Sequence, residues 1–174
     1  YHVCDPSVLR NVKLAGVVRP YVMYYTGADG LSGSGDKDGR TGVAWSPDGI
    51  AWTRLQQLTL QCQSNQDMGC QHFSAVKILE GNPDPAFGGR YVAIYSQSKP
   101  DGSTGTYVVE SGDGINWWGN AGVPGSLPQR IEYPAQFGYV YMNAGTDLMY
   151  DRHANRYLLT FTASQTEYVF AMPA

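Results

Sequence analysis

Short runs of alternating apolar and polar residues, rich in aromatic and β-branched side chains, recur along the chain and predict β-strands. The most regular are Tyr-Val-Met-Tyr-Tyr at 21–25, Tyr-Val-Ala-Ile-Tyr at 91–95 and Tyr-Leu-Leu-Thr-Phe at 157–161. A shorter apolar strand precedes each of them, at 7–9, 75–78 and 147–150. Turn residues interrupt every long window, which argues against a helical bundle or coiled coil and favours an all-β fold.

A second repeated pattern follows the first two of these strand pairs. Segments 46–52 and 111–117 share Ser, Asp, Gly, Ile and Trp in the same order. Glycine accepts a positive φ without steric cost, and aspartate caps a turn through the backbone, so each segment predicts a tight turn. The repeating unit is therefore a strand, a turn, an aromatic strand, a polar loop, a strand, an Asp-Gly turn and a short outer strand.

Four-stranded antiparallel units repeated in this way predict the blades of a β-propeller. The units span about 5–55, 73–120 and 145–174, and the third is incomplete, so 1–174 is expected to be a single partial propeller domain of about two and a half blades. A closed ring usually has at least four blades. We therefore expect the sequence, which starts at Tyr1, to be a processed form or part of a longer protein. The alternatives are a ring completed by several chains and a smaller sandwich.

Composition and charge narrow the class of partner. The net charge is −3, the pI is about 5.5 and no basic block occurs, which argues against a nucleic-acid surface. The apolar runs are shorter than the ~20 residues that span a bilayer, so no membrane span is expected. The sequence also lacks a nucleotide-binding glycine loop and a Gly-x-Ser-x-Gly nucleophile elbow.

Three cysteines bear on the compartment and on metal binding. Cys62 and Cys70 enclose a short polar loop and would form a disulfide in a secreted protein, while Cys4 is left over. Three reduced thiols are the alternative. Neither a CxxC pair nor histidines at zinc spacing are present, so no metal site is expected. Asp36 and Asp38 suit calcium by type, but they do not complete an EF-hand, so a solvated loop without a cofactor is the favoured interpretation.

The motifs also occur in an order typical of a known group of proteins. They are Cys-Asp-Pro-Ser-Val-Leu at 4–9, Tyr-Val-Met-Tyr-Tyr-Thr-Gly at 21–27 and Gly-Val-Ala-Trp-Ser-Pro-Asp-Gly-Ile-Ala-Trp at 42–52. This set resembles the five-bladed propeller glycoside hydrolases, among them arabinanases, xylosidases, fructosidases and the related mannoside phosphorylases. The two Asp-Gly segments also resemble the Asp-box of sialidases, although their spacing differs. The resemblance implies a ring of five blades and a carbohydrate substrate.

The resemblance implies roles for three carboxyl groups. Asp5 matches the aspartate before the first inner strand, which is the general base in inverting members and the nucleophile in retaining ones. Glu132, in Ile-Glu-Tyr-Pro, looks like the general acid of the fructosidases, where the family has Glu-Cys-Pro. Asp147, at the start of the third inner strand, is the alternative second carboxyl. Such a pair must flank the scissile bond, about 5–5.5 Å apart for retention and roughly 6.5–9.5 Å apart for inversion.

The second unit departs from the family pattern. The family has another aspartate there, but the equivalent run 71–76 reads Gln-His-Phe-Ser-Ala-Val. His72 and Asp67 are the candidate substitutes, and His72 would contact substrate. Trp45 and Trp118 occur in one unit each and are candidates to stack on sugar rings, whereas Trp52 and Trp117 recur in phase and are expected to pack within the blades.

Two functional hypotheses follow. The first is a secreted glycosidase that cleaves O-glycosyl bonds with Asp5 and a second carboxyl, Glu132 or Asp147. The second is a non-catalytic propeller that binds glycans or serves as a structural subunit of an extracellular assembly. The second hypothesis rests on the missing aspartate and on the incomplete ring.

Overall fold

The chain is all-β. The computed structural model describes residues 2–14, 16–28, 39–55, 58–60, 68–77, 91–98, 104–132, 140–141, 147–163 and 166–173. Every regular element in these ranges is a β-strand, which confirms the predicted fold class. Within the same ranges, no helix is long and apolar enough to cross a membrane.

The first sheet has the strand order that the sequence predicts. Its antiparallel strands, in spatial order, are β1 (His2–Leu14), β2 (Val17–Ala28), β3 (Arg40–Ser46) and β4 (Thr53–Leu55). β1 and β2 are longer than the apolar runs that predict them, and their pairing extends from His2 opposite Ala28 to Leu14 opposite Val17. The Asp-Gly turn at 46–52 connects β3 to the outer strand β4.

The second sheet differs from the prediction at its outer edge. Its strands, from the inside outward, are β6 (Met68–Lys77), β7 (Tyr91–Ser98), β8 (Thr104–Ser111) and β10 (Gln129–Arg130). The predicted outer strand after the Asp-Gly turn is reduced to one antiparallel bridge between Trp118 and Glu110 of β8, and β9 (Asn116–Trp117) pairs in parallel with β5 (Thr59–Leu60). A loop at 119–126 follows, and the chain pairs with β8 again as β10.

The third sheet is more complete than the sequence indicates. It consists of β12 (Asp147–Asp151), β13 (Arg156–Ala163) and β14 (Thr166–Pro173), with β11 (Val140–Tyr141) paired to the end of β13. The repeat pattern did not predict β14. The predicted four-stranded antiparallel sheets are thus present, but the described residues do not form a closed propeller.

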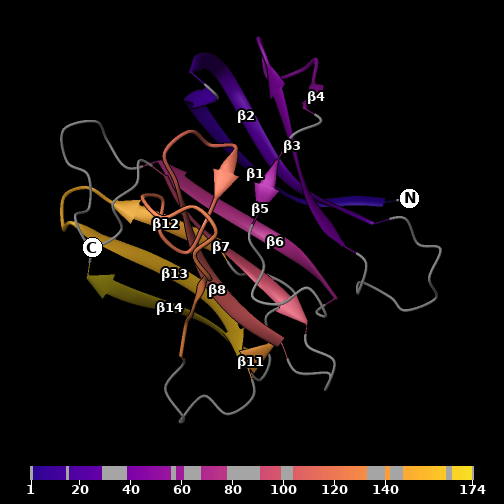
Figure 1. Ribbon diagram of the computed structural model, residues 1–174. Helices are drawn as coiled ribbons and strands as arrows, with labels where there is room; N and C mark the ends of the chain where they lie inside the picture. The colour runs from indigo at the N-terminus through magenta and orange to yellow at the C-terminus, as the bar shows by residue number, and fades with distance from the viewer. Residues whose placement is uncertain are drawn as a thin grey trace.

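The three sheets lie side by side. The strands that pack most closely between neighbouring sheets, β1, β6 and β12, are called the innermost strands below. β6 contacts β1 on one side and β12 on the other. Figure 1 shows the second sheet, in magenta to orange, between the first sheet at the upper right and the third at the lower left. The innermost strands β1, β6 and β12 therefore lie next to one another in space although they are far apart in the sequence.

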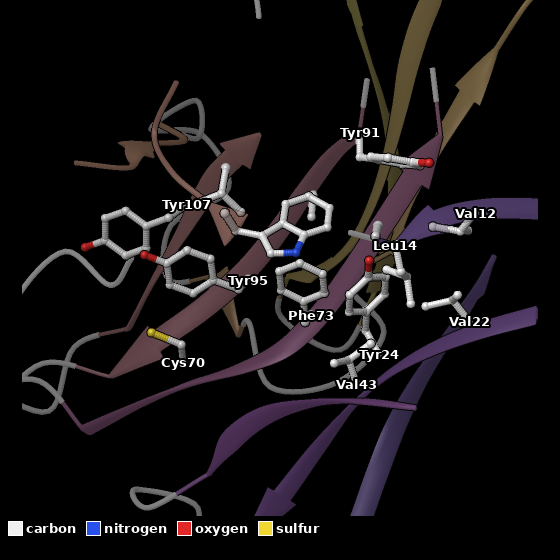
Figure 2. Packing of buried hydrophobic residues seen from close by; sticks show 14 residues of the cluster. Val12, Leu14, Val22, Tyr24, Val43, Cys70, Phe73, Tyr91, Tyr95 and Tyr107 are labelled. Atoms are coloured by element: carbon white, nitrogen blue, oxygen red, sulfur yellow. The ribbon is translucent and has the colours of Figure 1, made fainter. Parts of the chain in front are cut away.

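Aromatic rings fill the space between the first and second sheets (Figure 2). Tyr24 of β2 and Phe73 of β6 have ring centroids 5.0 Å apart, and Phe73 meets the buried Trp117 edge-on at 4.9 Å. Tyr95 and Tyr107 stack at 5.5 Å further along. Rings of this size bury roughly 150–250 Å² each, so this cluster dominates the joint between the two sheets. The expected packing role of Trp117 is confirmed.

A second cluster, of aliphatic and aromatic side chains, joins the second and third sheets. Val76, Val92 and Ile94 of the second sheet pack with buried side chains of the third. These are Leu148, Tyr157, Leu159 and Phe161. Since β7 contributes to both clusters, the second sheet is buried on both faces, as its fully buried residues 91–97 show.

The two Asp-Gly turns have the same hydrogen-bond network. In the first, Ser46 Oγ donates to Asp48 Oδ1 at 2.9 Å, and that oxygen accepts the amides of Ile50 and Ala51 at 2.8 and 2.9 Å. In the second, Asp113 Oδ1 accepts the Ser111 hydroxyl and the amides of residues 115 and 116, at 3.1, 2.9 and 2.8 Å. The following glycines have φ of 81° and 72°, as the turn prediction requires.

The surroundings of the two turns differ. The second turn packs against the first sheet, where the buried Tyr24 hydroxyl donates to the Gly114 carbonyl at 2.7 Å. Burial raises the pKa of Tyr24 well above its usual range, and the nearby Tyr91 and Asp113 add to that effect. The first turn is exposed, with Ile50 at 85% exposure. The same local structure is thus part of a sheet–sheet joint in one unit and part of the surface in the other.

Candidate active site at the innermost strands

β1 and β6 contain the same irregularity. In β1, Cys4 pairs with Thr26 and Ser7 with Tyr24. Residues 5 and 6 therefore lie opposite one residue of β2, which is a β-bulge. In β6, Gln71 pairs with Ser96 and Ser74 with Ile94, which leaves 72–73 in the same position. His72 of the second sheet therefore occupies the backbone position that Asp5 has in the first. The structure does not describe the His72 side chain, so its contact with substrate stays a prediction.

Asp5 has an unusual backbone conformation. Its φ is 52°, in the left-handed region that aspartate and asparagine enter more readily than most residues. The residue is partly buried, and its Oδ2 accepts a hydrogen bond from Cys4 Sγ at 3.0 Å. A bulge re-aims a side chain away from the regular alternation of a strand. The bulge thus sets the direction of the Asp5 side chain, and the ring of Pro6 fixes the φ of residue 6.

Two serines connect the innermost strands of the three sheets. The Ala75 amide of β6 donates to Ser7 Oγ of β1 at 3.1 Å. On the other side of β6, the Ser74 hydroxyl donates to Asp147 Oδ1 of β12 and accepts the Leu148 amide at 3.1 Å. These bonds bring the bulge of β1, the bulge of β6 and the start of β12 to the same end of the three sheets.

Asp147 lies at this junction, at a position related to the serines. Its backbone partner Thr160 is the fourth residue of the third aromatic strand. The fourth residues of the other two aromatic strands, Ile94 and Tyr24, are the backbone partners of Ser74 and Ser7. Asp147 is therefore the counterpart of the two serines. Its Oδ1 accepts the Leu148 amide at 2.9 Å in addition to the Ser74 hydroxyl.

Glu132 lies at the opposite edge of the second sheet. It follows β10, the outermost strand, and its side chain is 77% exposed and 3.7 Å from the Arg130 guanidinium. β8 and β7 separate β10 from β6, and strands lie about 4.8 Å apart, so the sheet is about 14 Å wide between its inner and outer strands. No contact among the described residues brings Glu132 to Asp5 or Asp147. Its role as an acid stays a prediction.

The two candidate tryptophans lie away from the innermost strands. Trp45 is on β3 opposite Val22, and one face of its ring is covered by the Arg19 guanidinium, 4.0 Å from the ring centroid. Trp118 bridges to Glu110 at the outer part of the second sheet. Nothing in the structure tests whether either contacts substrate.

The predictions about metals and the disulfide lie largely outside the described residues. Asp36, Asp38 and Cys62 are in segments that the structure does not describe. Cys70 is buried on β6, and its pairing with Cys62 stays a prediction. In the described part of the chain, no three His, Cys, Asp or Glu side chains gather in a way that could hold a metal ion.

Sequence reasoning missed Ser7 and Ser74, the residues that connect the innermost strands. A signal for them was available, because both follow a bulge at the same place in the repeat, in Asp-Pro-Ser and His-Phe-Ser. Comparison of the repeats residue by residue along the inner strands would have found them.

Comparison with known proteins gives a fold likeness and no family assignment. No family model and no curated protein matches this sequence. The arrangement of sheets is similar to that of a solved structure described as "Glycoside hydrolase", with a TM-score of 0.57, 12% identity, and coverage of 99% of this chain and 53% of that one. A second solved structure, described as a complex of BT0996 and RGII, matches with a TM-score of 0.53, 12% identity and the same coverage.

These similarities concern the fold alone, because 12% identity carries no residue-level correspondence. The chain spans about half the length of each of the two structures. The structure and the comparisons thus establish an all-β chain of mostly four-stranded antiparallel sheets, similar in fold to about half of a solved structure described as "Glycoside hydrolase".

Proposed function

We propose that this chain is a propeller-type carbohydrate-active module that cleaves glycosidic bonds at the end where β1, β6 and β12 meet. The observation that carries the proposal is the position of Asp5 in the bulge of β1, two residues before Ser7, which bonds to β6, while Ser74 of β6 bonds to Asp147 of β12. The distant fold similarity to a glycoside hydrolase supports the class of reaction.

Two carboxyl groups would divide the chemistry between them. Asp5 would act as the general base toward water or as the nucleophile, and the second carboxyl would protonate the leaving oxygen. We assign Asp147 as the second carboxyl ahead of Glu132, because Asp147 is on an innermost strand while Glu132 follows the outermost one. A substrate would thus be held between the start of β1 and the start of β12, across β6.

A specific observation favours the second candidate function, glycan binding without catalysis. The bulge of β6 presents His72 where the bulge of β1 presents Asp5, so the second sheet contributes no carboxylate at that position. In addition, the Asp147 carboxylate is already engaged by Ser74 and by the Leu148 amide. A site of this kind would bind a sugar and leave its linkage intact.

Hydrolysis of a panel of aryl glycosides and polysaccharides by the 174-residue chain tests the proposal. Asp5→Asn and Asp147→Asn are each expected to lower the rate of hydrolysis by about 10²–10⁴-fold, which is the usual contribution of a general acid or base. Asp151→Asn, at the other end of β12, is the matched control and is expected to keep the wild-type rate. Glycan affinity without turnover in the wild type would establish the alternative, and unchanged turnover in Asp5→Asn would refute the assignment of Asp5.

We further propose that the protein works outside the cytoplasm. The support is the predicted disulfide between Cys62 and Cys70, which would be stable in an oxidising compartment. The buried position of Cys70 on β6 fits a structural role of this kind.

A further inference from the structure

A shallow cleft of about 320 Å³ lies beside the second Asp-Gly turn. It is lined by Gly112, Asp113, Asn116, Trp118, Ala121 and Pro124. The turn follows Ser111, which pairs with Tyr91 at the start of β7, whereas the bulge of β6 lies opposite the other end of β7, near Ser96. The cleft and the Asp5 end of the innermost strands are therefore at opposite ends of the sheets.

Comparison of the two turns separates structural residues from those that form the cleft. Both turns share the serine, aspartate and glycine network, so this network is explained by the turn itself. At the third and fifth positions after the aspartate, the first turn has Ala51 and Thr53, and the second has Asn116 and Trp118. Both residues that are particular to the second turn line the cleft.

The remaining wall of the cleft comes from the loop at 119–126, which begins where the first sheet has β4 (Thr53–Leu55). Hydrogen bonds hold the loop in place: the backbone amide of Ala121 donates to the buried Glu110 carboxylate at 3.0 Å. Within the loop, Asn120 Oδ1 accepts the Gly122 amide at 2.8 Å, and the Asn120 amide donates to Ser126 Oγ at 2.8 Å. The cleft is thus preformed, as binding sites for small ligands usually are.

The lining indicates the chemistry of a ligand. Trp118 is partly exposed and offers an aromatic surface of the kind on which the C–H face of a sugar ring packs. The Asn116 amide, which donates to Asp113 Oδ2 at 2.7 Å, and the Asp113 carboxylate offer a donor and acceptors for hydroxyl groups. The six lining residues include a carboxylate and no lysine or arginine, which disfavours uronates, phosphates and other anions.

We propose that this cleft is a second carbohydrate-binding site, for a neutral sugar residue, with Trp118 as the stacking platform and Asn116 as the hydrogen-bonding side chain. It shares the class of ligand with the proposed function, on which the choice of sugars rests, but it uses none of the same residues. Two binding positions at opposite ends of the sheets would let the protein hold a polymeric glycan at one end while the other end acts on a chain.

The test is a titration of the 174-residue chain with methyl glycosides of pentoses, hexoses and deoxyhexoses, followed by the indole N–H signals of the four tryptophans. At least one neutral glycoside is expected to shift the Trp118 signal, which Trp118→Thr identifies by its absence. Trp118→Thr and Asn116→Ala introduce the residues that the first turn carries, so the turn is expected to fold in both variants. By titration calorimetry, we expect affinity to fall by about tenfold or more in Trp118→Thr and by about fivefold in Asn116→Ala. Ile50→Ala, at the exposed first turn, is the control with wild-type affinity.

The outcomes separate this site from the proposed active site. Asp5→Asn is expected to lose the hydrolysis of small aryl glycosides and to keep the Trp118 shift. A Trp118 signal that no methyl glycoside moves, or an Asn116→Ala variant with wild-type affinity, would overturn the proposal. It would also be overturned if choline moved the Trp118 signal and the glycosides did not, because a tryptophan beside a carboxylate also suits an organic cation.

Discussion

Single aspartates determine the geometry of the two repeated turns. Hydrogen bonds from the amides of Ala51 and Ile50 lower the pKa of Asp48 below its ordinary value. For Asp113, burial acts to raise the pKa, but hydrogen bonds from the amides of Asn116 and Ile115 and from two side chains outweigh it, and the pKa is lowered as well. Full stability of both turns therefore requires the ionised carboxylate, which accepts these bonds and donates none.

This requirement predicts an acid-sensitive contribution to stability. Because folding lowers these pKa values, the contribution is present above the ordinary aspartate pKa of about 3.9 and is lost as the pH falls through the lower, folded-state values. We expect Asp113→Asn to be less stable than wild type near neutral pH, with the difference narrowing at about pH 3. Urea unfolding midpoints across this range measure the effect, and Glu167→Gln on β14 is the control. A difference that stays constant with pH would contradict the account.

At the scale of the elements, identical turns have different neighbours. A Cβ on Gly114 would lie 2.8 Å from Leu14 Cδ2 and 3.1 Å from the Tyr24 hydroxyl, both in the first sheet. A Cβ on Gly49, the corresponding glycine, would meet nothing closer than the Tyr21 ring at 3.8 Å. The second turn is thus closely packed between two sheets, while the first has no close contact at its glycine.

Alanine substitution of the two glycines separates these contributions. Both positions have positive φ, so Gly49→Ala is expected to cost about 1–2 kcal/mol from the backbone alone. Gly114→Ala adds overpacking at the joint and is expected to cost a further 1–3 kcal/mol or so. Chemical denaturation measures both values. Equal losses of stability in the two variants would show that the second turn does not hold the sheets together.

The elements that the sequence predicts well are those governed by local pattern. The aromatic strands and the Asp-Gly turns are all found, because alternation and turn chemistry are visible in a few consecutive residues. The outer strand of the second sheet is shorter than the repeat predicts, since only Trp118 bridges to β8 before the loop at 119–126. The repeat does not predict β14, the counterpart of β3 and β8, because the Asp-Gly pattern that follows those two strands does not occur at 171–174.

At the scale of the whole molecule, the candidate site depends on contacts between distant parts of the sequence. The sequence predicts that Asp5 and Asp147 begin inner strands and that His72 substitutes for an aspartate in the second unit, but not that Ser74 joins Asp147. That contact follows from the pairing register and from how the sheets pack, which a local pattern does not encode. Glu132 illustrates the converse, since its motif resembles an acid while the strand it follows is the outermost one.

The described sheets also leave part of the predicted architecture open to test. The chain spans about half the length of the solved structures that it resembles, and the first turn has an exposed face where the second has a neighbouring sheet. Among the described residues, the first turn thus lacks the kind of neighbouring sheet against which the second turn packs.

The most direct test of the central claim is a crystal structure of the Asp5→Asn variant with a bound oligosaccharide. The substitution keeps the side-chain shape and is expected to leave the substrate uncleaved. We predict sugar density at the end where β1, β6 and β12 meet, with a glycosidic oxygen between residue 5 and the Asp147 carboxyl. A sugar bound only in the Trp118 cleft, or a residue 5 that faces away from β6 and β12, would contradict the account.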